Sequence, residues 1–508
     1  MNQMSTPIVA YDALKIAPFE MRLHDVKLVK KINEHARLTF TGVIPDDKEE
    51  SYVRMADEQT AIELLYTDAS GKSQRLFHGM ILRLQVKVSQ GVYWLEAEAV
   101  SHTYAMDIKQ EYRSFQNHSM LITDVMKKIN NNYPKAQTIN TFSDERSLGA
   151  YLLQYQETDW QFLKRLASHY HTVLIPITTQ DSIRMYLGFP NDRNAGELKS
   201  THYRVFKDLL AYKNEVDSDN PNLNEQDYIS YEVELNQILE LGDKVTFKGR
   251  KLHVFEVQTE MTRGVLTNKY TLCAKKAGYQ RKKFNRNIIG ASIQGKVREV
   301  VRDEVKVQLD YDQDWSLQTS SPFPYSTMYA SDDQTGWYCM PEKGDDIRLY
   351  FPSTKEPEGI AISSVRKKLP QEATQNSTPK NVTTTVVKQE ILQPIIQYDS
   401  EVKDDLMKNP NTKYLLTPTG QKILFEEDKI TIVGADGGAA ITLTNAGTII
   451  LNSSNKISIQ TGKQIEMVSQ SIMMVANQIE MSTAQGLAKF KIDQGQVLIK
   501  GVEVLMEK

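Results

Sequence analysis

The chain has 508 residues, of which 40% are hydrophobic and 25% are charged, and this composition is typical of a globular protein with about three or four domains. Its formal net charge of −3 argues against a general attraction to nucleic acid or to an anionic membrane surface. The first residues lack a basic region followed by an apolar run, and no stretch approaches 18 consecutive apolar residues. The sequence therefore predicts neither a signal peptide nor a membrane span, and we expect assembly in the cytoplasm.

Alternating apolar residues in the first 110 positions predict short strands. The clearest runs are 38–43, 61–66, 80–88 and 93–97, a spacing typical of a β-barrel or sandwich. Between about 117 and 170 the spacing becomes helical. Leu121, Ile122, Val125 and Ile129 follow Ser119, and the Thr158 and Gln161 pair predicts a capping box at the start of a second helix. The strand pattern returns from Thr172 to about 280.

Residues 153–166 carry the most specific motif of the chain. The residues that carry it are Gln154, Tyr155, Glu157, Thr158, Asp159, Phe162, Leu163, Arg165 and Leu166. This segment resembles the VgrG and phage late control D family, whose members form the hub and spike of contractile tails and type VI secretion machines. The resemblance implies a two-barrel hub with a helical insertion, over residues 1–285. Glu157, Asp159 and Arg165 could alternatively form a charged catalytic cluster, although acidic residues in a first helical turn are usually partners of the helix dipole.

Residues 286–366 predict a small barrel of the OB-fold type, because glycine-punctuated strands recur over about 75 residues. The spacing of Pro341, Gly344, Asp345, Ile347, Leu349 and Phe351 resembles the OB domain that follows the hub in the same family. Such a fold could bind single-stranded nucleic acid through aromatic side chains, here Trp315, Phe323, Tyr325, Trp337 and Tyr338. Seven Lys and Arg residues against 13 Asp and Glu residues in 288–365 oppose this interpretation. We therefore expect no nucleic-acid partner.

Three further groups of residues invite a metal or disulfide interpretation. Asp310, Asp312 and Asp314 are spaced like the start of a calcium loop, but Trp315 and Ser321 stand where that loop needs Gly and Glu. His169 and His171 form a close pair without further ligands, which is a weak metal signal. Cys273 and Cys339 lack metal-ligand spacing and are expected to be buried small side chains. We expect no bound metal and no cofactor.

The last fifth of the chain repeats every eight residues. Ile441, Ile449, Ile457 and Ile465 are each followed two positions later by Leu443, Leu451, Ile459 and Met467, with polar residues between them. Residues i and i+2 of a strand share a face, so each repeat offers two apolar side chains to one side. One such face cannot enclose a core. We therefore expect residues 413–508 to form an intertwined trimeric β-helix whose axis collects these eight residues.

Residues 367–412 predict an extended connector, which leaves no room for the lysozyme domain found at this place in some phage spikes. The order of hub, OB barrel, connector and β-helix matches that of the family. The resemblance implies a non-enzymatic homotrimer that joins a tail tube to a baseplate and pierces a target envelope on contraction. A hydrolytic tail spike and a trimeric receptor-binding fibre remain as alternatives.

The end of the chain continues the strand pattern and lacks histidine, since all nine histidines lie at or before His253. Self-tipped spikes of the family close their apex with histidine-bound metal. The resemblance therefore implies a separate PAAR-like tip protein, and we expect it to dock on Val497, Ile499, Val502 and Val504.

Overall fold

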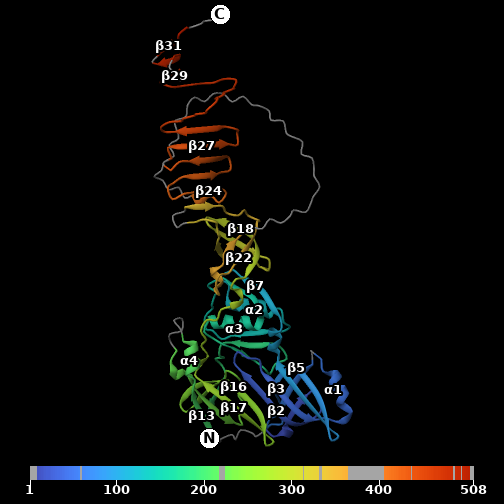
Figure 1. The fold of residues 1–508 in the computed structure, drawn as a ribbon. Helices are drawn as coiled ribbons and strands as arrows, with labels where there is room; N and C mark the ends of the chain where they lie inside the picture. Colours follow the sequence, from blue (N-terminus) through green and yellow to red (C-terminus); the bar gives the residue numbers. More distant parts are fainter. Residues whose placement is uncertain are drawn as a thin grey trace.

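The structure is a computed structural model that describes residues 9–57, 60–216, 223–312, 314–330, 335–363, 406–435, 437–483, 487–493 and 495–503. The molecule is elongated (Figure 1). Its N-terminal half forms a wide end, a small barrel lies in the middle, and stacked C-terminal strands form a narrow end. Most elements are strands, as the sequence predicts. Among the described residues, no helix has both the length and the apolar character that crossing a membrane requires.

The wide end is built on one twelve-stranded sheet. Its strands follow the order β1-β4-β5-β6-β3-β2-β16-β17-β14-β13, with β12 and β15 branching beside β16. The strands are β1 (Leu14–Ala17), β2 (Arg22–Lys31), β3 (Arg37–Val43), β4 (Ala61–Thr67), β5 (Ser73–Ser89), β6 (Val92–Ser101), β12 (Asn194–Glu197), β13 (Tyr203–Lys207), β14 (Ile229–Leu235), β15 (Lys244–Phe247), β16 (Arg250–Thr262) and β17 (Val265–Cys273). The helices beside them are η1 (Tyr11–Ala13), η2 (Asp46–Lys48), α1 (Glu49–Met55), α4 (Leu209–Glu215), η4 (Glu225–Tyr228) and η5 (Lys275–Gly278).

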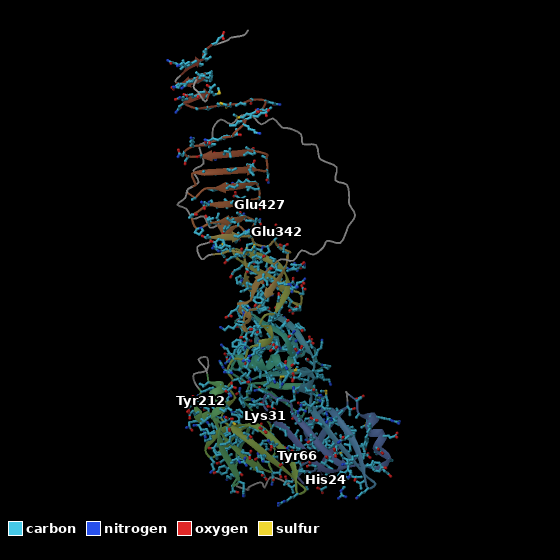
Figure 2. All side chains as sticks on the ribbon, in the orientation of Figure 1. His24, Lys31, Tyr66, Tyr212, Glu342 and Glu427 are labelled. Carbon is cyan, nitrogen blue, oxygen red and sulfur yellow. The ribbon has the colours of Figure 1, made fainter. Side chains whose placement is uncertain are left out.

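Two separate apolar cores lie on this sheet, one for each half of the wide end. The halves meet where β2 pairs antiparallel with β16, from Lys31 opposite Glu256 to Lys27 opposite Glu260. Lys31 is labelled in Figure 2. Its neighbour Lys30 is only 2% exposed, and its Nζ lies 2.7 Å from both carboxylate oxygens of Glu240. This ion pair satisfies a cation that would otherwise be buried without a partner.

The insertion between the halves contains more strands than the sequence analysis predicts. Its elements are η3 (His102–Asp107), β7 (Gln110–Phe115), α2 (Ile122–Asn130), β8 (Gln137–Asn140), β9 (Leu152–Thr158), α3 (Asp159–His169), β10 (Leu174–Pro176) and β11 (Arg184–Leu187). The predicted capping box of Thr158 and Gln161 is present at the start of α3. Helix α2 begins at Ile122, with Leu121 as its N-cap and no side-chain cap. Both helices bury their apolar faces in one core with Phe115 and Met185.

A small barrel over residues 292–362 follows. Its strands run in the order β20-β19-β18-β22-β23, and a parallel bridge between Tyr325 and Ala361 connects the two ends of this sheet. Its elements are η6 (Arg286–Ile288), which precedes it, β18 (Ser292–Val301), β19 (Glu304–Leu309), β20 (Pro322–Pro324), β22 (Asp346–Tyr350), η7 (Glu356–Glu358) and β23 (Ile360–Ile362). Strand β21 (Gly336–Tyr338) lies between β20 and β22 in the chain but pairs outside the barrel sheet, with β24. Its core includes Tyr151 and Leu153 from the insertion and Tyr414 from the C-terminal part. The barrel is therefore packed against both of its neighbours.

The C-terminal part consists of two antiparallel sheets. Five strands continue from β21 as a meander, and three later strands form a second sheet. The elements are η8 (Leu406–Lys408), β24 (Lys413–Leu416), β25 (Lys422–Phe425), β26 (Lys429–Val433), β27 (Ala439–Thr444), β28 (Ile449–Ser453), β29 (Gln478–Ser482), β30 (Lys489–Asp493) and β31 (Gln496–Lys500). Most of the predicted connector, residues 367–405, lies outside the described residues. Figure 2 labels Glu342 of the small barrel and Glu427 of the β25–β26 turn, which line one cavity between the barrel and the meander.

Two of the four predicted repeats differ from the expectation. Residues 454–477, all of them described, contain no strand, so Ile457, Ile459, Ile465 and Met467 do not belong to a ladder within the chain. All four are at least half exposed. The physical reason is that a strand is stable only when its edges and one face are paired or covered, and a single chain supplies no such partner here.

Candidate functional site

One face of the meander carries two parallel rows of apolar side chains, which we call the spike face. Residues directly opposite each other in antiparallel strands point to the same side of a sheet. The first row is Leu415, Ile423, Ile432, Ile441 and Leu451, and the second is Phe425, Ile430, Leu443 and Ile449. Eight of these nine side chains are between 37% and 69% exposed. A contiguous apolar surface of this kind is unusual for a monomer and marks an interaction site.

The opposite face of the same sheet has a different character. Leu424, Thr431, Val433, Ala440 and Thr442 alternate with the spike-face residues and are all less than 9% exposed. Because neighbouring residues of a strand point to opposite sides, the sequence alternation separates a buried face from an apolar exposed face. The spike face therefore lacks a covering layer among the described residues.

The structure brings together four of the eight residues that the sequence predicts as a trimer core: Ile441, Leu443, Ile449 and Leu451. The sequence analysis missed Leu415, Ile423, Phe425, Ile430 and Ile432, which extend both rows toward the small barrel. The last two carry the i, i+2 pattern and could have been found. The turns on either side of β26 differ in length from the later ones, so a strict search at intervals of eight overlooks them.

The second C-terminal sheet repeats the arrangement. Ile479, Ile492 and Val497 form one row, and Met481, Phe490 and Ile499 form the other. Val497 and Ile499 of the predicted tip-docking set are 62% and 55% exposed, and Val502 beyond them is 93% exposed. Val504, the fourth predicted residue, lies outside the described residues. The three described members thus present apolar surface at the narrow end of the molecule.

Two charged residues of the 153–166 motif, Glu157 and Arg165, form a buried ion cluster with Glu356 of the small barrel. Arg165 on α3 donates from Nε and Nη2 to Glu157 at 2.8 and 2.7 Å, and from Nη1 to Glu356 on η7 at 2.7 Å. All three side chains are more than nine-tenths buried. The cluster ties the wide end to the small barrel through a charge-assisted network.

Burial and the neighbouring charges act in opposite directions on the pKa values of Arg165 and Glu356. Burial alone would lower the pKa of Arg165, but the charges of Glu356 and Glu157 outweigh it and raise that pKa above its ordinary value. Burial raises the pKa of Glu356, and the nearby guanidinium opposes that rise. Since Arg165 is the cation shared by both carboxylates, its loss would leave two buried acidic groups without compensation.

Asp159 belongs to a second network and does not join Glu157 and Arg165. Its carboxylate accepts hydrogen bonds from Arg113, from Gln154 Nε2 at 2.9 Å and from Tyr133 at 2.9 Å. Asp159 is 1% exposed and Gln154 is fully buried. The predicted alternative of one catalytic Glu157, Asp159 and Arg165 cluster is therefore wrong in its geometry, because Arg165 pairs with Glu157 whereas Asp159 pairs with Arg113.

Two of the three aspartates with calcium-loop spacing contact other protein groups. Asp312 accepts hydrogen bonds from Leu309 N at 2.8 Å and Gln116 Nε2 at 2.7 Å, while Asp314 pairs with Lys128 at 2.8 Å. Across the described part of the chain, no group of three or more His, Cys, Asp or Glu side chains is arranged to hold a metal ion.

The side chains of the close histidine pair contact backbone carbonyl oxygens. A ring nitrogen of His169 lies 2.9 Å from the carbonyl oxygen of Lys283, and one of His171 lies 2.7 Å from that of Gln280. Both histidines thus fasten the segment that leads from the wide end into the small barrel. Burial lowers the pKa of His169 to about 4.

The aromatic residues of the small barrel do not form a stacking platform. Phe323 and Tyr338 are 1% and 6% exposed, and the indole nitrogen of Trp315 donates to the carbonyl oxygen of Val307 at 3.2 Å. Tyr325 is half-buried, so Trp337 is the one member of the predicted set that is substantially exposed, at 44%. The cysteine prediction is correct for Cys273, which is buried, and wrong for Cys339, which is exposed because it follows the short edge strand β21.

A histidine pair in the wide end, in which His78 is buried and His102 partly buried, predicts pH-dependent stability. His78 Nδ1 lies 2.6 Å from His102 Nε2, and burial together with the neighbouring His78 lowers the pKa of His102 from 6.5 to about 4. Between those two pH values an unfolded chain binds a proton that the folded His102 does not bind. The free energy of unfolding should therefore fall as the pH drops from 6.5 to 4, by up to about 3 kcal/mol from this residue.

Urea unfolding of the full chain and of a His102→Gln variant at pH 7.5 and 4.5 measures this effect. We expect the variant to lose less stability than the parent chain between the two pH values. An equal loss in both proteins would show that the pair does not carry the pH dependence.

Comparisons with known proteins agree with the motif. Residues 49–173, which include the 153–166 segment, match the family model described as phage tail baseplate hub (GPD). No curated protein sequence matches the chain.

Among solved structures, the Escherichia coli c3393 protein, a component of the type VI secretion system, is 12% identical, with a TM-score of 0.49 over 70% of this chain and 99% of its own. The Francisella PdpA-VgrG complex is 9% identical, with a TM-score of 0.44 over 88% of both chains. The 43 kDa tail protein of prophage MuSo2 from Shewanella oneidensis is 10% identical, with a TM-score of 0.40 over 54% of this chain and 99% of its own. The likeness to a baseplate hub therefore depends on residues 49–173, which match the phage tail GPD family model and contain the 153–166 motif.

Proposed function

We propose that the chain is the hub and spike of a contractile injection system or phage-like tail, and that it works as a homotrimer. The observation that carries the proposal is the pairing of a baseplate hub domain at the wide end with an uncovered spike face at the narrow end. Three copies arranged about an axis along the spike face would cover it and would pair the free strand edges. The hub would join a tail tube to the baseplate, and the narrow end would enter the target envelope on contraction.

Negative-stain electron microscopy of the purified full chain tests this shape. We expect particles with a wide three-fold head and one thin shaft that ends in the C-terminal strands. Compact single-chain particles with a separate, mobile C-terminal part would contradict the proposal.

The proposed role is mechanical, and we expect no hydrolysis of cell-wall material. The charged residues of the family motif are buried in structural networks. A buried group that resembles a catalytic triad, His35 with Thr103 and Asp107, has its hydroxyl on a residue that is 1% exposed. Purified peptidoglycan incubated with the chain should release no soluble muropeptides. Release that is lost on mutation of a carboxylate in this chain would favour the alternative of a hydrolytic spike.

We also propose that a separate PAAR-like protein caps the narrow end. The exposed Val497 and Ile499 of β31 and the exposed Val502 beyond it support this proposal, because an apolar surface at a strand edge favours a docking partner. Co-expression of the full chain with a PAAR-like protein that a neighbouring gene encodes should yield a complex. A version truncated after Gln496 should not retain the partner, and equal capture by both would contradict this docking site.

A further inference from the structure

The first row of the spike face does not end at the meander but continues into the small barrel. Strand β21, which lies between two barrel strands in the chain, pairs with β24, and Trp337 stands directly opposite Leu415. A bridge between Ala330 and Gly336 then brings Tyr329 beside Trp337, whose backbone N–H donates to the Tyr329 carbonyl at 2.8 Å. Two aromatic residues of the barrel therefore extend the row Leu415, Ile423, Ile432, Ile441 and Leu451.

Both aromatic side chains are exposed although β21, which carries Trp337, is well anchored. Trp337 is 44% exposed and Tyr329 is 47% exposed. On the other face of β21, Tyr338 is 6% exposed and stacks on Tyr414, with ring centroids 4.9 Å apart and planes 14° apart. The buried side thus fixes the strand, and alternation directs Trp337 to the same side as the spike face.

We infer that Tyr329 and Trp337 pack against the same two residues of two further copies of this chain, as an aromatic collar that closes the base of the axial core. This inference depends on the proposed trimer. Neighbouring strands lie about 4.8 Å apart, so an axis that passes the spike face at Leu415 passes Trp337 one strand later. The partner that fits the collar is therefore the copy that covers the spike face.

The chemistry of the two residues suits the end of an apolar core. Tryptophan and tyrosine bury a large apolar ring and keep one polar group that can remain in contact with water. The collar lies at the base of the core, where apolar surface meets water, whereas the following positions of the row are aliphatic. The small barrel and the meander would then assemble as one body, so that thrust on the barrel passes to the spike without an intervening joint.

Fluorine NMR on the full chain labelled with 5-fluorotryptophan tests the collar. A Trp337→Phe variant identifies the Trp337 resonance, and its solvent isotope shift reports its exposure. We expect that shift to be largely lost in the assembled chain and present in an Ile441→Asp variant that stays monomeric. A trimer in which Trp337 keeps its full isotope shift would overturn the collar and leave the proposed function intact. Absence of any trimer would overturn both.

A second comparison does not depend on the monomeric variant. Trp337→Ala should raise the rate at which subunits exchange between trimers by about tenfold or more, because it removes a large ring from the interface. Met328→Ala is the matched control, since Met328 is 88% exposed and directly precedes Tyr329 in the chain. Equal exchange rates for both variants and the parent chain would contradict the collar.

Discussion

Replacing Ile441 with aspartate should abolish the trimer. Ile441 lies in the first row of the spike face, between Ile432 and Leu451, and it is 42% exposed in the single chain. In a trimer the substitution would place three carboxylates together in an apolar core. Each would lose its hydration without gaining a partner, at a cost of several kcal/mol per group. We expect size-exclusion chromatography with light scattering to show monomers only.

The matched control for this variant is Asn452→Asp. Asn452 stands opposite Ala440, on the face of the sheet away from the spike face, and unlike Ala440 it is only partly buried. The same new charge there should leave the trimer unchanged. Equal disruption by both substitutions would show that added charge, rather than burial at the axis, is responsible.

Replacing Arg165 with alanine should have the largest effect on the stability of the subunit itself. The substitution leaves Glu157 and Glu356 buried without their shared cation, and breaking a buried ion pair in this way costs about 3–5 kcal/mol. Urea unfolding measures the loss. We expect the small barrel and the insertion to be affected together, because Glu356 belongs to one and Glu157 to the other.

Arg54→Ala is the control for that experiment. Arg54 also pairs with a glutamate, Glu50, at 2.8 Å, but both side chains are about four-fifths exposed. Exposed pairs of this kind contribute about 0–1 kcal/mol. If Arg165→Ala were no more destabilising than Arg54→Ala, the buried cluster would not hold the barrel to the wide end.

Local patterns were sufficient to predict much of the fold. The capping box of Thr158 and Gln161 fixes the start of α3 because both partners lie within one helical turn. The alternation of apolar and polar residues identifies β5 and β6, because this pattern also lies within a few consecutive residues. The pairing of β2 with β16 could not be predicted, since it joins segments more than 200 residues apart through backbone hydrogen bonds, which any sequence can form.

Among the functional residues too, those with a local sequence pattern could be predicted and those defined by a distant partner could not. Ile441, Leu443, Ile449 and Leu451 were predictable because a strand of period two displays its apolar face in the sequence. In the sequence Trp337 is a candidate for nucleic-acid stacking, and only its position opposite Leu415 places it in line with the first row of the spike face. Glu356 was not singled out, because its partner Arg165 lies 191 residues earlier in the chain.

The most direct test of the account is the mass of the purified full chain in solution, measured by multi-angle light scattering. One chain has a mass of 58.0 kDa, and we predict a single species of three times that mass that persists on dilution. A stable, folded species of 58.0 kDa would leave the spike face uncovered and would contradict the proposed hub and spike.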